Sequence, residues 1–286
     1  MSDFRYHGGV LDKSKGYFQK DYKLQDPKLE LYNKDLDNLD GWYSKEDLMY
    51  LDWLSKLPFN RQGGVCELGV HMGKMFHAMM ATVVDDSKSY AVDLFNELFI
   101  YNVSLSGGYP KYVWGERNLP PEKDPSIHQR SFFKSITDHW EEEGILDGSK
   151  LVIKSNDSNY MTPDDFDNNK FKFVSIDAGH HYHNVIADLK LAEQIVARNG
   201  VVIVDDWMSM EWYGVTQATM EYMKNGGILV PFCGHGKKLY LCRYNAKNLY
   251  LDAMADFPWK RHEHMLCGNK VYNICDTRYF IDDLDK

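Results

Sequence analysis

Between residues 65 and 243, short apolar runs alternate with longer segments in which apolar side chains recur every three or four positions. The short runs predict buried strands, and the longer segments predict amphipathic helices. Strands that are apolar along their whole length belong to a parallel sheet covered on both faces. We therefore predict a doubly wound sheet, with strands at 65–70, 90–93, 151–154, 173–177 and 201–205 and helices at 74–84, 128–143, 183–197 and 211–224.

The last two apolar runs of this region are connected differently. Runs 227–232 and 238–243 are separated only by the turn Cys233-Gly-His-Gly-Lys237, which is typical of a hairpin. The sheet is therefore expected to end with an antiparallel strand. The complete prediction is an α/β, Rossmann-like, doubly wound sheet of seven mostly parallel strands.

The flanking segments lack this alternation. Ser44 is suited to the N-cap of a helix that ends at Pro58, whereas the first 40 residues are polar and weakly periodic, as in an extended arm. We expect three parts: an N-terminal arm and helix at 1–60, a main domain at 61–243, and a C-terminal extension at 244–286 that packs on the domain without a regular pattern of its own.

Composition and charge exclude several classes of function. The 286 residues carry 33 basic and 42 acidic side chains, giving a net charge of −9, and no long basic cluster of the kind that tracks nucleic-acid phosphates. The first residues hold no apolar signal-peptide core, and no uncharged stretch reaches the roughly 20 residues that span a bilayer. The five cysteines form no CxxC pair. We therefore expect a reduced, cytoplasmic protein that binds neither nucleic acid nor membrane.

A glycine-containing loop joins the first predicted strand to its helix. Glu67-Leu-Gly-Val-His-Met-Gly73 has the pattern E-x-G-x-x-x-G, in which Gly69 and Gly73 permit a tight turn and the close approach of a ligand. The following helix offers free N–H groups to an anionic group. Asp93 ends the next strand, 20 residues after Gly73, where an acid commonly accepts hydrogen bonds from ribose hydroxyls. The alternative for the loop is an ordinary turn between a strand and a helix, and the alternative for Asp93 is an Asp that begins a turn at the end of a strand.

Asp157 and Ser158 follow the strand at 151–154, at the same edge of the predicted sheet. An Asp at this place is suited to meet an adenine amino group, although Asn-Asp-Ser is also common loop chemistry. The chain has no G-x-G-x-x-G between this strand and helix, which disfavours a dinucleotide pyrophosphate.

Three carboxylates follow the fourth and fifth strands. Asp177 ends one strand and Asp205-Asp206 end the next, and a single helix joins these strands, so they should be parallel neighbours. Carboxylates crowded at one edge repel one another unless protons or a cation neutralise them. Their oxygens suit a hard divalent ion such as Mg²⁺ or Mn²⁺. The alternative is that one of them caps the helix at 211–224.

His180 and His181 lie within one turn of Asp177. A His beside such a metal site has a pKa suited to a general base. The alternative for any single His is a helix-capping or surface role, which the third nearby His, His183, makes less favoured. Aromatic residues are expected to stack on a ring of a bound ligand or simply to pack a lid; these are Phe99, Tyr101, Tyr109, Tyr112, Trp114 and Trp207.

Over residues 62–243 the sequence resembles the class I S-adenosylmethionine-dependent methyltransferases. The resemblance implies that the loop with Glu67, Gly69 and Gly73 binds the methionine part of the cofactor. It places Asp93 at the ribose and Asp157 at the adenine, and it implies that Asp177 and Ser158 also contact the cofactor site.

Two longer runs are similar to a narrower bacterial branch, the macrocin-type and mycinamicin-type sugar O-methyltransferases. They begin at Phe173-Val-Ser-Ile-Asp-Ala-Gly-His and at Asn199-Gly-Val-Val-Ile-Val-Asp-Asp. The typical form is I-D-G-x-H-x-Y, a helix carrying an Asp, and G-G-V-I-x-x-D-D, from which Ala178 and Asn199 depart. The resemblance implies Mg²⁺ on Asp177, Asp205 and Asp206, and His180 as the base.

The sequence therefore predicts a metal-assisted O-methyltransferase that acts on a hydroxyl of a small molecule, a sugar or a glycosylated natural product. His181 is the second candidate base. We expect a homo-oligomer, because unmatched extensions flank the domain on both sides. The alternatives are a metal-dependent hydroxylase or hydrolase on the same fold, and a binding subunit without catalysis.

Overall fold

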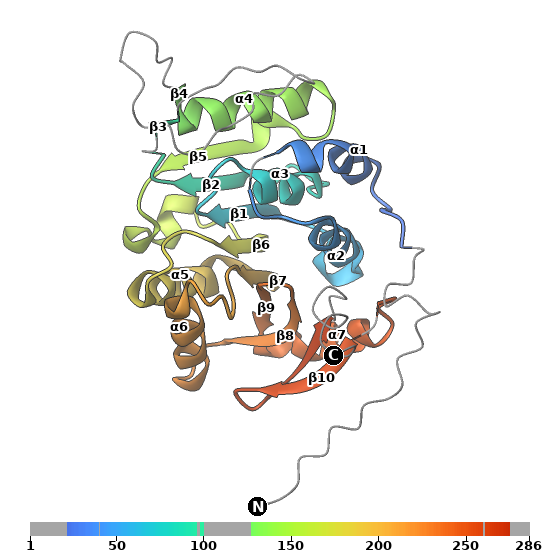
Figure 1. Cartoon of the computed structure of the whole chain (residues 1–286), viewed down its shortest axis with the longest axis vertical. Helices are drawn as coiled ribbons and strands as arrows, with labels where there is room; N and C mark the ends of the chain where they lie inside the picture. Colours follow the sequence, from blue (N-terminus) through green and yellow to red (C-terminus); the bar gives the residue numbers. More distant parts are fainter. Residues whose placement is uncertain (1–21, 40, 96–97, 100–126, 260, 275–286) are drawn as a thin grey trace, which may run out of the picture.

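The computed structural model describes residues 22–39, 41–95, 98–99, 127–259 and 261–274. Its centre is a nine-stranded sheet in the order β10-β11-β8-β9-β7-β6-β1-β2-β5 (Figure 1). The strands are β1 Gly64–Leu68, β2 Ser89–Asp93, β5 Leu151–Ser155, β6 Phe171–Ile176, β7 Val196–Val204, β8 Leu229–His235, β9 Lys238–Arg243, β10 Arg261–Leu266 and β11 Asn269–Ile274. A separate pair joins β3 (Leu98–Phe99) to β4 (Ile127–His128).

The pairing of the strands confirms the predicted class of fold. Strands β5, β2, β1, β6 and β7 pair in parallel with their neighbours. Strand β9 then pairs antiparallel with both β7 and β8, as the predicted hairpin requires. The predicted count of seven strands is too low, because β11 adds in parallel to β8 and β10 completes a second hairpin.

Helices cover both faces of the sheet, as a doubly wound fold requires. Strand residues alternate between two hydrophobic clusters: Phe173 of β6 belongs to one and its neighbour Val174 to the other. The first cluster takes in α1 (Pro27–Asp35), α2 (Lys45–Lys56), α3 (Lys74–Ala81), α4 (Gln129–Glu142) and α7 (Lys247–Ala255), and the second takes in α5 (Tyr182–Ile195) and α6 (Tyr213–Lys224). Figure 1 shows α5 and α6 on one side of the sheet, opposite α2 and α3.

Helix α2 begins where its sequence predicts. The Ser44 hydroxyl accepts a hydrogen bond from the backbone N–H of Asp47, whose carboxylate accepts one from the backbone N–H of Ser44 in return. This capping box satisfies two N–H groups that the start of a helix leaves free. Buried Leu48, Leu51 and Leu54 then join α2 to the first hydrophobic cluster.

Both flanking segments contain elements that the sequence analysis missed. Helix α1 lies within the segment expected to be an irregular arm, and it buries only Leu29 and Tyr32. Two buried positions in nine residues leave too weak a period to recognise. The four central residues of β10 are exposed, so the strand shows no alternation of apolar and polar positions.

The helices and the cysteines bear on what the composition predicts about membranes and disulfides. Among the residues that the structure describes, no helix combines the length and apolar character needed to cross a membrane. Cys66, Cys233, Cys242 and Cys267 are free thiols, and Cys275 lies outside the described residues.

Candidate functional site

The sheet topology gathers the predicted site residues at one edge. Strands β1, β2, β5, β6 and β7 run in parallel, so their carboxyl ends meet at the same side of the sheet. The last residues of neighbouring strands lie in register, as in the pair of Leu68 with Ile176 and the pair of Ile176 with Val204. The loops that follow these strands begin at adjacent points, where open α/β sheets bind ligands.

Asp177, His180 and Asp206 form a compact cluster at this edge. The His180 Nε2 atom lies 3.3 Å from Asp177 Oδ1 and 3.1 Å from Asp206 Oδ2. One potential ligand atom from each residue lies within 4.8 Å of the others, in the only such group among the described residues. Two carboxylates and one imidazole this close together are a set of donor atoms that suits a divalent cation.

The carboxylates alter the acid–base behaviour of His180. Hydrogen bonds from the His180 ring to the carboxylates of Asp177 and Asp206 raise the pKa of His180 to about 9, against the opposing effect of burial. Burial would raise the pKa of Asp206, but the His180 contact holds it below its usual range. The His180 ring also stacks on Trp212, with ring centroids 4.6 Å apart. The imidazole is therefore held in place by one aromatic and two acidic neighbours.

Asp205 lies next to the cluster but has other partners. Its Oδ2 atom is paired with the buried ammonium group of Lys238, and its Oδ1 atom accepts the backbone N–H of Asp206 at 2.8 Å. Burial raises the pKa of Asp205, and Lys238 opposes that rise. The structure therefore brings two of the three predicted metal ligands together with His180, while Asp205 faces a lysine.

His181 has a different position from His180. It occupies the N-cap of α5 without a side-chain capping bond, and it is exposed. Its ring lies 6.1 Å from that of His183, and neither ring belongs to the cluster. The side chain of His181 therefore lies at the helix surface.

The glycine loop after β1 has the tight backbone that its sequence predicts. Gly69 and Gly73 have positive φ angles of 84° and 83°. A Cβ atom on Gly69 would lie 2.2 Å from the backbone oxygen of Asp177, and one on Gly73 would lie 2.5 Å from the ring of His77. Both positions therefore require glycine, and the loop passes directly against the start of the Asp177 loop.

Asp93 holds this loop in place. Its Oδ2 atom accepts the backbone N–H groups of Val70 and His71, each at 3.0 Å, and its Oδ1 atom accepts that of Phe95 at 2.9 Å. The carboxylate predicted to bind a ribose thus also fixes the backbone between Gly69 and Gly73.

Glu67 is a buried carboxyl group at the end of β1. It is 2% exposed, and its Oε2 atom has no hydrogen-bond partner among the described residues. Burial, reinforced by nearby Asp177, raises the pKa of Glu67 well above its usual range. An unsatisfied buried oxygen beside a glycine loop is a feature that a polar ligand group can complete.

Asp157 and Ser158 occupy the edge of the sheet beyond β5. Asp157 caps the short 3-10 turn Ser158–Tyr160 by accepting the backbone N–H and the side-chain amide of Asn159, at 3.0 and 2.7 Å. Ser158 is buried near Asp188 of α5, which is 0% exposed. Asp157 therefore has a structural role whatever ligand it meets.

Two residues of this edge, Lys238 and Trp212, were not predicted from the sequence to belong to the site. Lys238 lies in β9, distant along the chain, and no local pattern pairs it with Asp205. Trp212 lies in an aromatic-rich loop after β7, and that enrichment is the one signal that pointed to it. Trp207, predicted to stack on a ligand, is only 8% exposed. The predicted residues Tyr101, Tyr109, Tyr112 and Trp114 and the side chain of Phe99 lie outside the described residues.

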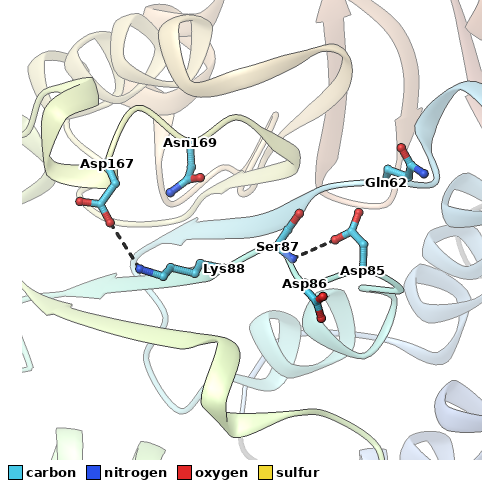
Figure 2. A pocket seen from close by; sticks show the side chains of 7 residues that line it. All are labelled: Gln62, Asp85, Asp86, Ser87, Lys88, Asp167 and Asn169. Carbon is cyan, nitrogen blue, oxygen red and sulfur yellow. Dashed lines mark hydrogen bonds and ion pairs between the residues drawn. The ribbon is translucent and has the colours of Figure 1, made fainter.

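A polar depression lies at the opposite edge of the sheet (Figure 2). It is lined by residues that precede β1, β2 and β6, among them Asp85, Lys88 and Asp167. Lys88 and Asp167 form an ion pair across it at 3.7 Å, and both are largely exposed. This depression is at the amino ends of the strands and holds none of the clustered ligand atoms.

The comparison with known protein families decides the class of this domain. A family described as a methyltransferase domain matches residues 66–207, from β1 to the loop after β7. Residues 66–207 are a methyltransferase domain. The matched range contains the glycine loop, Asp93 and the whole Asp177–His180–Asp206 cluster. No curated protein matches the chain.

Several solved structures are similar to this chain. CalS11, a TDP-rhamnose 3′-O-methyltransferase of calicheamicin biosynthesis, is 15% identical, with 76% of this chain and 93% of that chain covered and a TM-score of 0.48. An O-methyltransferase from Bacillus cereus in complex with SAH is 12% identical, with coverage of 77% and 92% and a TM-score of 0.46. MycE in complex with Mg, SAH and mycinamycin VI is 13% identical, with coverage of 77% and 55% and a TM-score of 0.45. Likenesses of this size say nothing about the substrate of this chain.

Proposed function

We propose that this chain transfers a methyl group from S-adenosylmethionine to a hydroxyl of a small molecule, with help from a divalent cation such as Mg²⁺ or Mn²⁺. The observation that carries the proposal is the Asp177–His180–Asp206 cluster at the carboxyl edge of a methyltransferase domain. The glycine loop after β1 lies directly beside it, because Gly69 contacts the backbone of Asp177. The cofactor and the cation would thus be neighbours.

The residues present fit both groups. For the cation, two carboxylates and one imidazole supply atoms within 4.8 Å of one another. For the cofactor, Glu67 has an unpartnered buried oxygen beside the glycine loop, which packs directly against the backbone of Asp177. Helix α3 begins at Lys74 with no side-chain capping bond from Gly73, and the N-terminus of a helix attracts an anionic group such as the carboxylate end of the cofactor.

Asp177 and Asp206 would hold the cation, and Glu67, Asp93, Asp157 and Ser158 would hold the cofactor. A divalent cation at this place lowers the pKa of an acceptor hydroxyl, and S-adenosylmethionine supplies the methyl group. The bond from sulfur to methyl breaks as the bond from oxygen to methyl forms.

His180 would bind the cation or take the hydroxyl proton at Nε2. In the absence of a cation its pKa is raised to about 9, so it is mainly protonated at neutral pH. A divalent cation next to it would lower that pKa and leave Nε2 free to accept. Either role requires the position between the two carboxylates that the structure gives it.

The acceptor is proposed to be a sugar or a glycosylated natural product, as the sequence resemblance implies. Trp212, which stacks on His180, is 38% exposed and offers aromatic surface beside the cluster. Such surface suits the apolar face of a sugar ring. We also propose that the chain forms a homo-oligomer. We further propose that it consists of three parts, an N-terminal part, a main domain and a C-terminal extension, divided at residues 60 and 243.

Transfer of labelled methyl groups from S-adenosylmethionine to vicinal-diol acceptors, including nucleotide sugars, tests this function. We expect transfer with Mg²⁺ and at least about a hundredfold less in excess chelator, while binding of S-adenosylhomocysteine persists. Restoring Mg²⁺ should restore transfer. Full transfer in chelator would contradict the role of the cation, and consumption of the acceptor without label would favour the hydroxylase or hydrolase alternative.

A further inference from the structure

Lys238 is a buried cation directly beneath the candidate site. Its side chain is 4% exposed, in β9, and its ammonium group pairs with Asp205 Oδ2. An ammonium group loses much of its hydration in such a place, and only close negative charges offset that cost. Despite burial, Asp205, Asp47 and Asp177 raise the pKa of Lys238 above its usual range. Lys238 therefore remains charged within a ring of carboxylates.

The surroundings of Lys238 come from the N-terminal part of the chain. Its ammonium group lies over the ring of Tyr43 at 5.7 Å, and the Tyr43 hydroxyl donates to the backbone oxygen of Asp47 at 3.1 Å. Asp47 Oδ1 faces His235 Nε2 at 3.6 Å, and His235 pairs with Lys238 across the β8–β9 hairpin. The start of α2 and the hairpin thus hold the lysine from two sides.

Asp205 has no oxygen left without a close partner. Oδ2 meets Lys238, and Oδ1 accepts the backbone N–H of Asp206 at 2.8 Å. Asp206 has a positive φ of 53°, a conformation that side-chain residues rarely adopt without support. The hydrogen bond from the Asp206 N–H to Asp205 Oδ1 supports that conformation, in which the Asp206 carboxylate meets His180.

We propose that Lys238 is a positioning residue of the methyltransferase site, whose ammonium group is the built-in counter-ion of Asp205. It fixes Asp205 as the support of the Asp206 backbone and keeps its carboxylate out of the ligand set of the cation. The carboxylate ligands from this chain are then Asp177 and Asp206, with His180 beside them. This inference rests on the proposed function, and it replaces the expectation that Asp205 is a ligand.

Binding of Mn²⁺ to the full chain without cofactor, followed by the electron paramagnetic resonance signal of the free ion, tests the proposal. Asp206→Asn should weaken binding at least about a hundredfold, because it removes a ligand. Asp205→Asn should weaken it less than about tenfold, because it removes only a nearby charge. Equal losses in the two variants would overturn the proposal.

Variants of Lys238 should change the affinity for Mn²⁺ in a way that a purely structural role would not produce. Lys238→Met should bind Mn²⁺ at least about tenfold more tightly than the wild type, because Asp205 loses its counter-ion and turns to the cation. In that background Asp205→Asn should cost at least about tenfold, unlike its effect in the wild type. Lys238→Arg keeps the charge and should stay within about threefold of the wild type. Unchanged affinity in folded Lys238→Met would overturn the proposal.

Lys224→Met serves as the matched control, because it removes one exposed lysine from the last turn of α6. If Lys238→Met fails to fold, the comparison of Asp205→Asn with Asp206→Asn still decides. A wild-type chain that binds S-adenosylhomocysteine but not Mn²⁺ would overturn this inference and leave methyl transfer standing. A chain that binds neither would overturn the proposed function itself.

Discussion

His180 differs from its neighbour His181 through its contacts alone. Both residues follow Asp177 closely, and the sequence offers either as the base. The structure turns His180 toward Asp177 and Asp206 and leaves His181 exposed at the start of α5. A sequence pattern fixes which residues lie near a strand end, but the direction of each side chain depends on the backbone of the turn.

Replacing His180 with Ala should lower methyl transfer by about a hundredfold or more, the usual contribution of a positioned acid or base. Affinity for S-adenosylhomocysteine should stay nearly unchanged, because His180 is held by Asp177 and Asp206 and not by the glycine loop. Steady-state rates and calorimetry measure the two effects. His181→Ala is the control and should keep the wild-type rate; a large loss there with none in His180→Ala would reverse the assignment.

Asp188 is a buried acid whose surroundings change its pKa. It lies on α5 with 0% exposure, close to the side chain of Ser158. Burial raises the pKa of Asp188 to about 7, although Ser158 opposes the rise. The folded state therefore favours the neutral carboxyl group. The contribution of Asp188 to stability is greatest below the unfolded pKa of about 3.9 and declines up to about pH 7.

Asp188→Asn should therefore stabilise the fold more at high pH than at low pH. We expect the free energy of unfolding to rise by about 1–3 kcal/mol at pH 8, and by much less near pH 4. Urea unfolding at the two pH values measures the difference. Asp252→Asn, at an exposed position of α7, is the control and should show little effect at either pH. An equal gain for Asp188→Asn at both values would contradict the account.

At the scale of the element, the glycine loop is the part that the sequence predicted best. Its pattern sits between an apolar strand and an amphipathic helix, and all three signals are local. The observed φ of 84° at Gly69 agrees with the predicted tight turn, and the close approach that the structure shows is to the backbone of Asp177. Local signals fail for α1 and β10, since few of their residues are buried and their form depends on the elements beside them.

Gly69→Ala should weaken binding of S-adenosylhomocysteine by at least about tenfold, because a Cβ atom there forces the loop away from Asp177. The clash is with backbone atoms, the nearest at 2.2 Å, so no side chain can move to relieve it. Gly144→Ala is the matched control: it also has a positive φ, of 71°, but no atom lies within 4 Å of its added Cβ. Equal cofactor affinity in the two variants would show that the close approach is unimportant.

At the scale of the whole molecule, the structure shows where part of the acidic excess behind the net charge of −9 lies. Glu67, Asp93, Asp177, Asp205 and Asp206 all lie at the carboxyl edge of the sheet, which the order of the parallel strands creates. The sequence predicted this edge because strands joined by single helices run in parallel, so that their carboxyl ends lie on the same side of the sheet. It did not predict the Lys238–Asp205 pair, 33 residues apart, because a hairpin on the far side of β7 brings these residues together.

The carboxyl edge of this methyltransferase domain is expected to bind the methyl donor. Calorimetric titration of the full chain with S-adenosylhomocysteine tests it most directly, in the presence of Mg²⁺ and again in excess chelator. We predict a single site per chain with a Kd of about micromolar size in both conditions, and loss of binding in Gly69→Ala. The absence of binding to folded wild-type protein in both conditions would contradict the account.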